Sequence, residues 1–409
     1  HARRAHWQLG ENVCACAFRQ HTARRVQRWR HAQHLANAKL TYNLPSLPAL
    51  KATVNVGGDF SEGTGYTVTP ASSASGYYTQ GRYSKYRTTK TNKLFESYLS
   101  YNSGSKWEKQ TLEVVAGYSY QDWDTYSPNN PTWNEAQDSI IAPEAAFPFY
   151  TRNVLMSYYG RAIYNYDGKY VLNVSVRRDG SSRFSPDTRW GIFPAASAAW
   201  LISEEAFLKD SKTVNMLKLR AGWGVTGQQD GIGDYSYIGN YFQGATTAQY
   251  AFGGQYYQVL RPAGFDANLR WETTTSYNFG LDFGFKNDRF SGSVDVYQKD
   301  TRDLLATVPV PAGTKFTNEI LTNVGAMQNR GIEASVNTGI IAKKDMRLDW
   351  SINATYNKNT VVKLSQVVDT TSPGVLIGGI GGGIGNTIQA HQIGYPTYTF
   401  FVLEQQYDS

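Results

Sequence analysis

The sequence predicts an all-β protein, an antiparallel up-and-down transmembrane β-barrel with its long loops on one side. Three observations support this prediction. Apolar and polar residues alternate along segments of about ten residues, connectors between the segments alternate between short and long, and the chain is rich in aromatic residues yet polar on average. Such segments suit strands with one face toward lipid and one toward water.

The composition excludes a helical membrane protein. Aromatic residues make up 14% of the 409 residues, with 29 Tyr and 10 Trp, whereas the mean hydropathy is −0.46. No run approaches the roughly 18 consecutive apolar residues of a membrane-spanning helix. A barrel remains compatible with this composition, because its strands are short and alternate between apolar and polar residues.

The first 36 residues differ in composition from the rest of the chain. They hold seven Arg against one acid, Glu11, together with five of the six His and both Cys. Their net charge is +6, and the whole chain has a charge of +7, so the remainder is close to neutral. Almost all of the net positive charge therefore lies in this segment, and no nucleic-acid partner is expected.

Three interpretations of this segment are open. The first is a zinc site, although its spacing matches no familiar finger or ribbon, and its ligands would be Cys14, Cys16, His31 and His34. The second is a basic arm for nucleic acid or a membrane surface. The third, which we favour, is a disordered or artefactual segment, because it lacks a strand period and a signal-peptide cleavage site. The predicted domains are thus a non-homologous segment, 1–36, and a partial barrel, 37–409.

From residue 37 onward, the best segments separate into two faces when every second residue is taken. A helix, with about 100° between residues, would scatter these apolar side chains, whereas a strand lines them along one face. These segments are therefore predicted to be strands. Their apolar faces consist of Leu112, Val114, Ala116, Tyr118 and Tyr120; of Tyr277, Phe279, Leu281, Phe283 and Phe285; and of Leu348, Trp350, Ile352, Ala354 and Tyr356.

The connectors between these segments alternate in length. In an up-and-down sheet, alternate connectors lie at opposite ends of the strands, so all the long loops fall on one side, as in bacterial outer-membrane barrels. Short connectors are expected near Leu44–Pro48, Asn102–Lys109, Tyr166–Gly168, Lys286–Arg289 and Ala342–Asp345. Long connectors are expected near Ser61–Lys90, Gln121–Tyr150, Gln228–Arg270, Asp303–Gln328 and Lys363–Gly394.

The connector Ser203–Thr213 has an intermediate length, and we expect a helical turn there on the short-connector side. About 13 strands are expected in all. A soluble β-sandwich is the alternative, but its strands usually have about five or six residues and its inner faces pack dry. Here the second face is rich in Asn, Asp, Ser, Thr and Gly. Aromatic pairs at strand ends, such as Tyr158 and Tyr159, also suit an interfacial belt.

Several stretches carry longer motifs. Gly160–Trp200 contains GR-x-x-Y-x-Y-x-x-KY, then R-x-DGSS-x-F and FP-x-x-S-x-x-W. Later stretches contain LK-x-R, L-x-WE-x-T, D-x-Y-x-K-x-T-x-DLL and N-x-G-x-M-x-N-x-GIE. In order and spacing, residues 37–405 resemble the SusC/RagA-like TonB-linked outer-membrane proteins. The other stretches with this likeness are Lys39–Ala52, Leu217–Gln229, Leu269–Phe285, Val294–Leu305 and Asn323–Asn337.

The resemblance implies an importer of oligosaccharides or peptides in the outer membrane of a Bacteroidetes-type Gram-negative cell. Its implied partners are a SusD-like surface lipoprotein, the TonB–ExbB–ExbD complex and outer-membrane lipid. Barrels of this kind close at about 22 strands around a plug, so about 13 strands would be an incomplete barrel. The family's plug domain, TonB box and C-terminal strands have no counterpart here. Because lipid does not tolerate unpaired strand edges, we do not expect the chain alone to transport.

The motif residues are predicted to shape the barrel rather than to contact a substrate. DGSS is interpreted as a turn with positive φ at its glycine, and Asn329–Gly331 as a turn before a strand. The strand glycines Gly222, Gly224, Gly280 and Gly284 are expected to leave room for bulky neighbours. The structural set is Gly160, Arg161, Asp179, Gly180, Phe193, Pro194, Trp200, Trp271, Glu272, Gly331 and Glu333.

No catalytic constellation emerges from the sequence. After the first segment, His391 is the single histidine, which argues against His-based acid–base or metal chemistry. The glycine run Gly378–Gly385 lacks the Lys-Ser/Thr of a phosphate-binding loop. Glu204 and Glu205 are adjacent on a turn and would point apart rather than flank a glycosidic bond. The sequence therefore predicts no enzyme, no cofactor and no metal.

The long connectors offer aromatic side chains, whose faces stack on sugar rings. Loop packing or contact with the partner lipoprotein explains them equally well. The candidate ligand-binding residues are Trp123, Tyr126, Trp133, Tyr235, Tyr237 and Tyr241. The leading hypothesis is the importer, and the alternative is a soluble glycan-binding β-sheet protein. An outer-membrane hydrolase barrel is disfavoured by the missing histidines.

Overall fold

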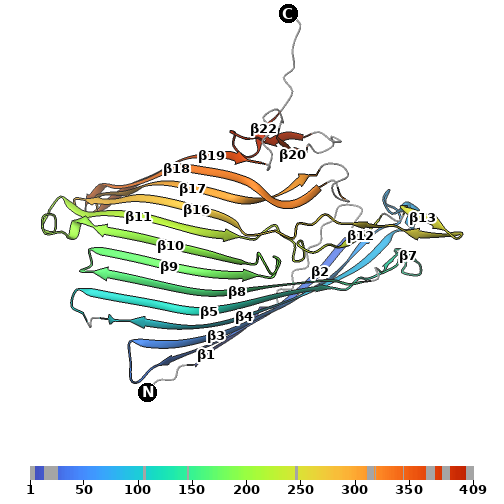
Figure 1. Ribbon diagram of the computed structural model, residues 1–409, viewed down its shortest axis with the longest axis horizontal. Helices are drawn as coiled ribbons and strands as arrows, with labels where there is room; N and C mark the ends of the chain where they lie inside the picture. The colour runs from blue at the N-terminus through green and yellow to red at the C-terminus, as the bar shows by residue number, and fades with distance from the viewer. Residues whose placement is uncertain are drawn as a thin grey trace, which may run out of the picture. The chain divides into compact units, whose positions relative to one another are not determined.

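The computed structural model consists of β-strands with short 3-10 turns such as η1 (Tyr77–Thr79) and η3 (Ile202–Glu204) (Figure 1). Its described residues contain no helix long and apolar enough to cross a bilayer. These residues are 5–12, 26–104, 107–144, 147–244, 247–310, 317, 319–343, 345–364, 374–379 and 387–401. The prediction of an all-β chain is confirmed.

The chain divides into two compact units. Unit 1 comprises His1–Tyr101, Val115–Tyr158 and Gly180–Ser182. Unit 2 comprises Asn102–Val114, Tyr159–Asp179 and Arg183–Ser409. Strands β5, β8 and β9 contribute residues to both units.

In unit 1 the strands follow one another in the sheet order β1-β2-β3-β4-β5-β8, and the pairs β1·β2, β2·β3 and β3·β4 are antiparallel. The short strands β6 and β7 pair beside the end of β4. The bounds are β1 (Ala5–Asn12), β2 (Val26–Asn43), β3 (Leu50–Thr69), β4 (Arg82–Asn102), β5 (Gln110–Ser127), β6 (Thr132–Trp133), β7 (Ile140–Ala142) and β8 (Phe149–Tyr166).

In unit 2 the sheet order is β9-β10-β11-β16-β17-β18-β19, again the order of the sequence. The bounds are β9 (Tyr170–Ser181), β10 (Trp190–Leu201), β11 (Val214–Gln228), β16 (Glu272–Phe285), β17 (Phe290–Pro309), β18 (Glu319–Lys343) and β19 (Met346–Lys363). Small sheets lie in its long connectors, built from β12 (Tyr241–Gln243), β13 (Gln249–Phe252), β14 (Gln255–Gln258), β15 (Leu260–Pro262), β20 (Val375–Gly379), β21 (Thr387–His391) and β22 (Thr399–Phe400). The up-and-down prediction is confirmed, and the described residues place thirteen strands in the two sheet orders, against about 13 expected.

The strand register gives unit 2 two chemically different faces. One row of paired residues is polar, and it consists of Lys218, Asp282, Ser293, Ser335 and Asn353. The next row is apolar, and it consists of Leu219, Leu281, Val294, Ala334 and Ala354. Side chains alternate between the faces along every strand, so the predicted alternation is realised across neighbouring strands.

Unit 1 shows the same separation. Ala38, Val56 and Phe95 are paired neighbours on the apolar face of β2, β3 and β4. On the polar face, the Asn55 amide donates to Glu96 over 3.2 Å, and Asp59 accepts hydrogen bonds from the amides of Gln33 and Asn92. Direct cross-strand pairs of this kind stabilise a sheet and fix its register.

The short connectors lie where the sequence predicts them. Each of the five falls between consecutive strands, for example Lys286–Arg289 between β16 and β17. The intermediate connector begins with the 3-10 turn η3, as expected. In unit 2 these short connectors lie at one end of the strands, and β12 to β15 lie at the other (Figure 1).

The strands are longer than the expected ten residues or so, and the long connectors are correspondingly shorter. β3 continues to Thr69 and β4 begins at Arg82, so most of Ser61–Lys90 is strand rather than loop. Polar residues and glycine predominate in these extensions, as in Ser61–Gly65, so their alternating hydrophobic signal is weak. The backbone pairing nevertheless continues, because the ladder needs only N–H and C=O groups.

Strand β2 crosses the predicted domain boundary at residue 36. β2 begins at Val26 and pairs with β3 from Val26↔Val68 to Asn43↔Lys51. His31 and His34 therefore lie on a strand, whereas Cys14 and Cys16 lie outside the described residues. The start of this strand was not predicted, because its Arg, His and Gln side chains interrupt the apolar alternation. They leave the backbone pairing intact.

Two predicted turns are also strand. Asp179–Ser181 forms the end of β9, and Gly180 does not adopt positive φ. Asn329–Gly331 lies inside β18, where each residue pairs with β17 and β19. Turn-forming residue types are present in both places, but the neighbouring strands supply a continuous ladder, and tertiary context overrides local propensity.

Candidate functional site

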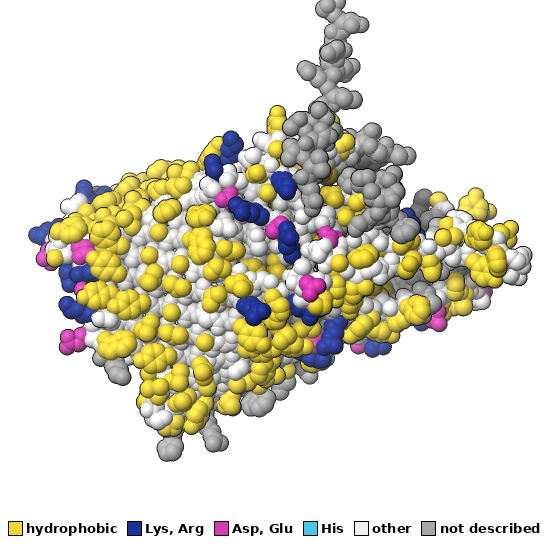
Figure 2. Space-filling view, in the orientation of Figure 1, with side chains coloured by type: hydrophobic (Ala, Val, Ile, Leu, Met, Phe, Trp, Pro, Cys, Tyr) yellow, Lys and Arg dark blue, Asp and Glu magenta, His cyan; other side chains and the backbone are white. Residues whose placement is uncertain are grey.

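The apolar face of unit 2 exposes large side chains rather than burying them. Leu172, Phe279 and Ile352 are 47%, 64% and 47% exposed. Figure 2 shows hydrophobic side chains spread over the strands, with charged side chains at the left edge and in a second group right of centre. A surface of this extent is unsuited to water and suited to lipid.

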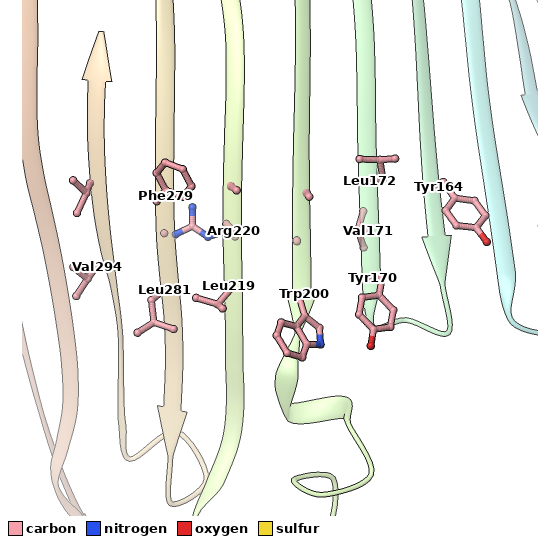
Figure 3. Close-up of a pocket in the computed structure, with 15 residues that line it drawn as sticks. Tyr164, Tyr170, Val171, Leu172, Trp200, Leu219, Arg220, Phe279, Leu281 and Val294 are labelled. Atoms are coloured by element: carbon pink, nitrogen blue, oxygen red, sulfur yellow. The ribbon is translucent and has the colours of Figure 1, made fainter.

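An apolar groove of about 690 Å³ runs along this face. It is lined by the small side chains of Ala198 and Ala221 and by larger apolar side chains such as Leu172, Leu219 and Phe279 (Figure 3). Tyr170 and Trp200 close its short-connector end, with stacked rings whose centroids are 6.3 Å apart. Aromatic side chains with a polar group are typical of a membrane interface.

Glu205 holds this aromatic pair. The Tyr170 hydroxyl donates to Glu205 Oε1 over 2.5 Å, and Trp200 Nε1 donates to the same oxygen over 3.0 Å. These hydrogen bonds, with the charge of Lys169, lower the pKa of the Glu205 carboxyl below its usual range. Trp200, a predicted structural residue, is thus held at the sheet edge by the connector that follows it.

The polar face of unit 2 carries a three-residue charge network. The Arg220 guanidinium bonds both oxygens of Asp282, at 2.9 and 2.7 Å, and reaches Asp295 at 2.9 Å. It lies over Gly280, where a Cβ would collide with it. The prediction that Gly280 makes room for a bulky neighbour is confirmed, and the neighbour is a side chain of the same sheet.

The candidate aromatic residues of unit 1 lie in strands rather than in an open loop. Trp123 and Tyr126 belong to β5, and Trp133 belongs to β6. Trp133 pairs with Tyr83 of β4, and the Lys85 ammonium lies 5.9 Å from its ring centre. Its ring face is therefore already in contact with a cation.

The candidate residues of unit 2 lie in the connector between β11 and β16. Tyr235 and Tyr237 follow β11, and Tyr241 begins β12. Tyr235 and Tyr241 are 44% and 69% exposed. The hairpin β13–β14 in the same connector presents further exposed rings, which are Tyr250, Phe252, Tyr256 and Tyr257. These aromatic side chains are accessible, as is Tyr126 of unit 1, which is 41% exposed.

Three motif blocks meet in a buried aromatic cluster, defined here as Phe184, Phe193 and Trp271. The ring centroids of Phe184 and Phe193 lie 5.2 and 5.3 Å from that of Trp271. The Trp271 indole donates to the Arg189 carbonyl over 2.9 Å. Such pairs add to the free energy of area burial, so these side chains of the FP and WE motifs and of DGSS-x-F stabilise this part of the sheet.

Residues of two further motifs form hydrogen bonds with Arg270 and Glu272 at the start of β16. The backbone N–H of Leu305 donates to Glu272 at 3.4 Å, and Arg270 pairs with Asp303 at 2.7 Å. The Asn323 side chain accepts from Arg270 N–H and donates to the carbonyls of Arg270 and Asp303. Sequence reasoning missed Asn323 as a positioning residue, although it opens the N-x-G motif.

The remaining motif residues lie within the strands of the sheet. Arg161 donates to Asn173 over 3.0 Å, and Asp179 pairs with Arg177. Gly331 lies under the ring of Tyr297, where a Cβ would collide with it. Gly160, Pro194 and Glu333 lie in β8, β10 and β18, and Gly180 is fully covered.

The described residues hold no group of three or more His, Cys, Asp or Glu side chains that could bind a metal. His391 of β21 contacts the Tyr398 ring at 4.8 Å and accepts its backbone N–H at 3.3 Å. Burial lowers the pKa of this histidine. A neutral imidazole held by a ring and a backbone amide is a packing residue in this connector.

Comparison with known proteins gives one consistent family. A family model described as TonB dependent receptor-like, beta-barrel, matches residues 15–402. TonB-dependent receptor SusC of Bacteroides thetaiotaomicron is 37% identical over 382 residues, which cover 91% of this chain and 37% of that protein. TonB-dependent receptor P39 of Formosa agariphila is 35% identical over 298 residues, covering 69% of this chain and 27% of that protein.

Among solved structures, that of the RagAB peptide transporter matches with a TM-score of 0.72 at 23% identity. The match covers 91% of this chain and 40% of that chain, so this chain spans well under half the length of its relatives. At this identity the likeness shows the fold. Together with two-faced strands, one-sided long connectors and the family match, it places the chain in the TonB dependent receptor-like β-barrel family, whose members are outer-membrane proteins.

Proposed function

We propose that this chain is the barrel wall of an importer that takes up oligosaccharides, or peptides, through the outer membrane of a Bacteroidetes-type cell. The observation that carries the proposal is the 37% identity to SusC across 91% of the chain. The convergence of separate motif blocks on Trp271 and Asn323 supports it, because residues far apart in sequence serve one local architecture.

The proposed partners follow from the same relatives. They are a SusD-like surface lipoprotein at the long-connector side and the TonB–ExbB–ExbD complex as the energy source. The exposed rings of Tyr235, Tyr241 and the β13–β14 hairpin would contact the lipoprotein or the substrate, since aromatic faces suit both partners. Neither a catalytic role nor a cofactor is part of the proposal.

The test uses the complete receptor gene that contains this region. We expect its deletion to abolish growth on one or a few members of a panel of oligosaccharides and peptide digests, each supplied as the limiting nutrient. Complementation with the full gene should restore growth, and complementation with Trp271→Ala should restore less, because the barrel is destabilised. Unchanged growth and nutrient uptake on the whole panel would contradict an importer.

Fractionation separates this proposal from a soluble glycan-binding protein. The tagged receptor is expected in the outer-membrane fraction and to retain a lipoprotein after detergent extraction. A folded, detergent-free receptor fragment that binds oligosaccharides with saturation would favour the soluble alternative. The exposed apolar side chains of the sheet argue against that alternative.

A further inference from the structure

On the apolar face of unit 2, the side chains change from apolar to polar across one row of paired residues. The last apolar row on this face consists of Phe279, Val296, Ile332 and Tyr356, on β16 to β19. The next row toward the long connectors, here called the boundary row, consists of Tyr277, Gln298, Arg330 and Lys358. The row beyond it is polar and consists of Thr275, Asp300, Gln328 and Thr360. Four strands therefore change from apolar to polar at the same level.

This level corresponds to the edge of the hydrocarbon. On β19 the apolar face extends from Leu348 to Tyr356, and Lys358 is its next residue. Eight residue steps of about 3.3 Å, on a strand tilted by about 40°, cover roughly 20 Å along the membrane normal, close to the roughly 25 Å apolar band of such barrels. The boundary row thus lies where lipid headgroups begin, on the long-connector side.

A groove of about 610 Å³ lies across the last apolar row and the boundary row. Its apolar part includes Phe279 and Tyr356, which are 64% and 66% exposed. Its polar part contains the side chains of Arg330 and Lys358 on adjacent strands. Neighbouring strands are about 4.8 Å apart, so both cations can approach one anionic group.

The charge around the groove is positive. Asp300 is the acid of the neighbouring polar row, and it accepts hydrogen bonds from the Gln298 and Gln328 amides at 2.7 and 2.6 Å. Arg302 follows on the same face of β17. With Arg330 and Lys358, three cations surround one carboxylate, which two amides bond and whose charge also attracts Arg330 and Arg302. Cations on a lipid-facing surface are costly unless they are near the interface or have an anionic partner.

We propose that this groove binds a phosphorylated, acylated sugar lipid of the outward-facing leaflet. The phosphate would lie between Arg330 and Lys358, with Gln298 donating to it, and an acyl chain would lie along Phe279, Val296 and Ile332. Tyr277 and Tyr356 flank the cations, and their ring faces suit the sugar. Arginine and lysine both bind phosphate, arginine with a planar fork. The site requires the membrane-barrel fold, but it is independent of what the receptor imports.

The test uses the full-length receptor in zwitterionic detergent, titrated with a monophosphorylated, acylated glucosamine disaccharide lipid and followed by native mass spectrometry. The R330Q/K358Q double variant is expected to bind this lipid about tenfold or more weakly, because two charge-assisted contacts are lost. Arg330→Lys keeps the charge and should retain most of the binding. The matched control is Arg347→Gln, on the same strand at the short-connector end, which should bind within about twofold of the parent.

Removing the phosphate from the same lipid should weaken its binding to the parent receptor to the level of the double variant. A heat-modifiable band on SDS gels will show that each variant is folded. Equal binding by the folded double variant, or equal binding of the lipid with and without phosphate, would overturn the site. Tighter binding of phosphatidylglycerol than of the sugar lipid would overturn the choice of ligand. None of these outcomes depends on nutrient uptake, so they are separate from a failure of the proposed import function.

Discussion

At the scale of single residues, Trp271 is the centre of the buried aromatic cluster of unit 2. It is 7% exposed, contacts both Phe184 and Phe193, and its ring N–H bonds a backbone carbonyl. Phe193 in turn lies over Gly227, where a Cβ would collide with its ring. Phe193 of β10 therefore contacts both β11 and Trp271, which immediately precedes β16.

We expect Trp271→Ala to lower the free energy of unfolding by about 3–5 kcal/mol, because it removes a buried aromatic side chain and leaves a cavity. The measurement is the urea midpoint of the folded band on SDS gels. Phe207→Ala is the control, since Phe207 is 74% exposed on a short connector and should change stability by less than about 0.5 kcal/mol. Equal effects of the two substitutions would show that the cluster does not stabilise the fold.

Glu205 gives a prediction about pH. Hydrogen bonds from Tyr170 and Trp200 lower its pKa in the folded protein, so its contribution to stability is present at neutral pH. That contribution is lost as pH falls through the lowered pKa, below the usual value of 4.5. Glu205→Gln should therefore melt at a lower temperature than the parent at pH 7, and the difference should shrink below pH 4.5. A difference that stays constant through this range would contradict the assigned role of the carboxylate.

At the scale of elements, the β13–β14 hairpin is held by backbone pairing and presents exposed rings. Its strands pair with each other and its aromatic rings are exposed, so the rings can contact other molecules. Replacing Tyr250, Tyr256 and Tyr257 by Ser should leave the heat-modifiable band unchanged while reducing lipoprotein recovery or oligosaccharide binding by about tenfold. Loss of the folded band would show instead that the hairpin is structural.

The strand elements also show where sequence patterns stop being informative. Alternation identified β5, β16 and β19 because one of their faces is apolar. It missed the end of β3 and the starts of β2 and β4, where polar residues predominate. Backbone hydrogen bonds alone continue these strands, and hydrogen bonds leave no hydrophobic period in the sequence.

At the scale of the whole molecule, the two faces of the sheet predict which substitutions a membrane barrel tolerates. Ile352 lies on the apolar face of β19, and Asn353 lies on its polar face. Ile352→Arg should destabilise the inserted barrel by about 2–4 kcal/mol, because it places a charge in the apolar band. Asn353→Arg should assemble almost normally. The readout is the folded fraction of receptor in outer membranes, and equal assembly of both variants would contradict the assignment of the faces.

The candidate sites were only partly predictable. Phe193, Trp271 and Gly331 were identified as architectural by their motifs, and the structure assigns each a specific contact. The aromatic residues chosen as ligand-binding remain predictions, and Trp123 and Tyr126 proved to lie in a strand. Asn323 was missed because an amide within a motif does not reveal which carbonyls it will meet.

The sequence by itself determined the fold class, the short connectors and the family, because alternation with period two and ordered motifs are local properties of the chain. Only the tertiary structure decided where the strands end, which motif residues meet and where the apolar face gives way to Arg330 and Lys358. These features depend on register between strands that are distant in sequence. Register is set by many cross-strand contacts together, and no single segment contains that information.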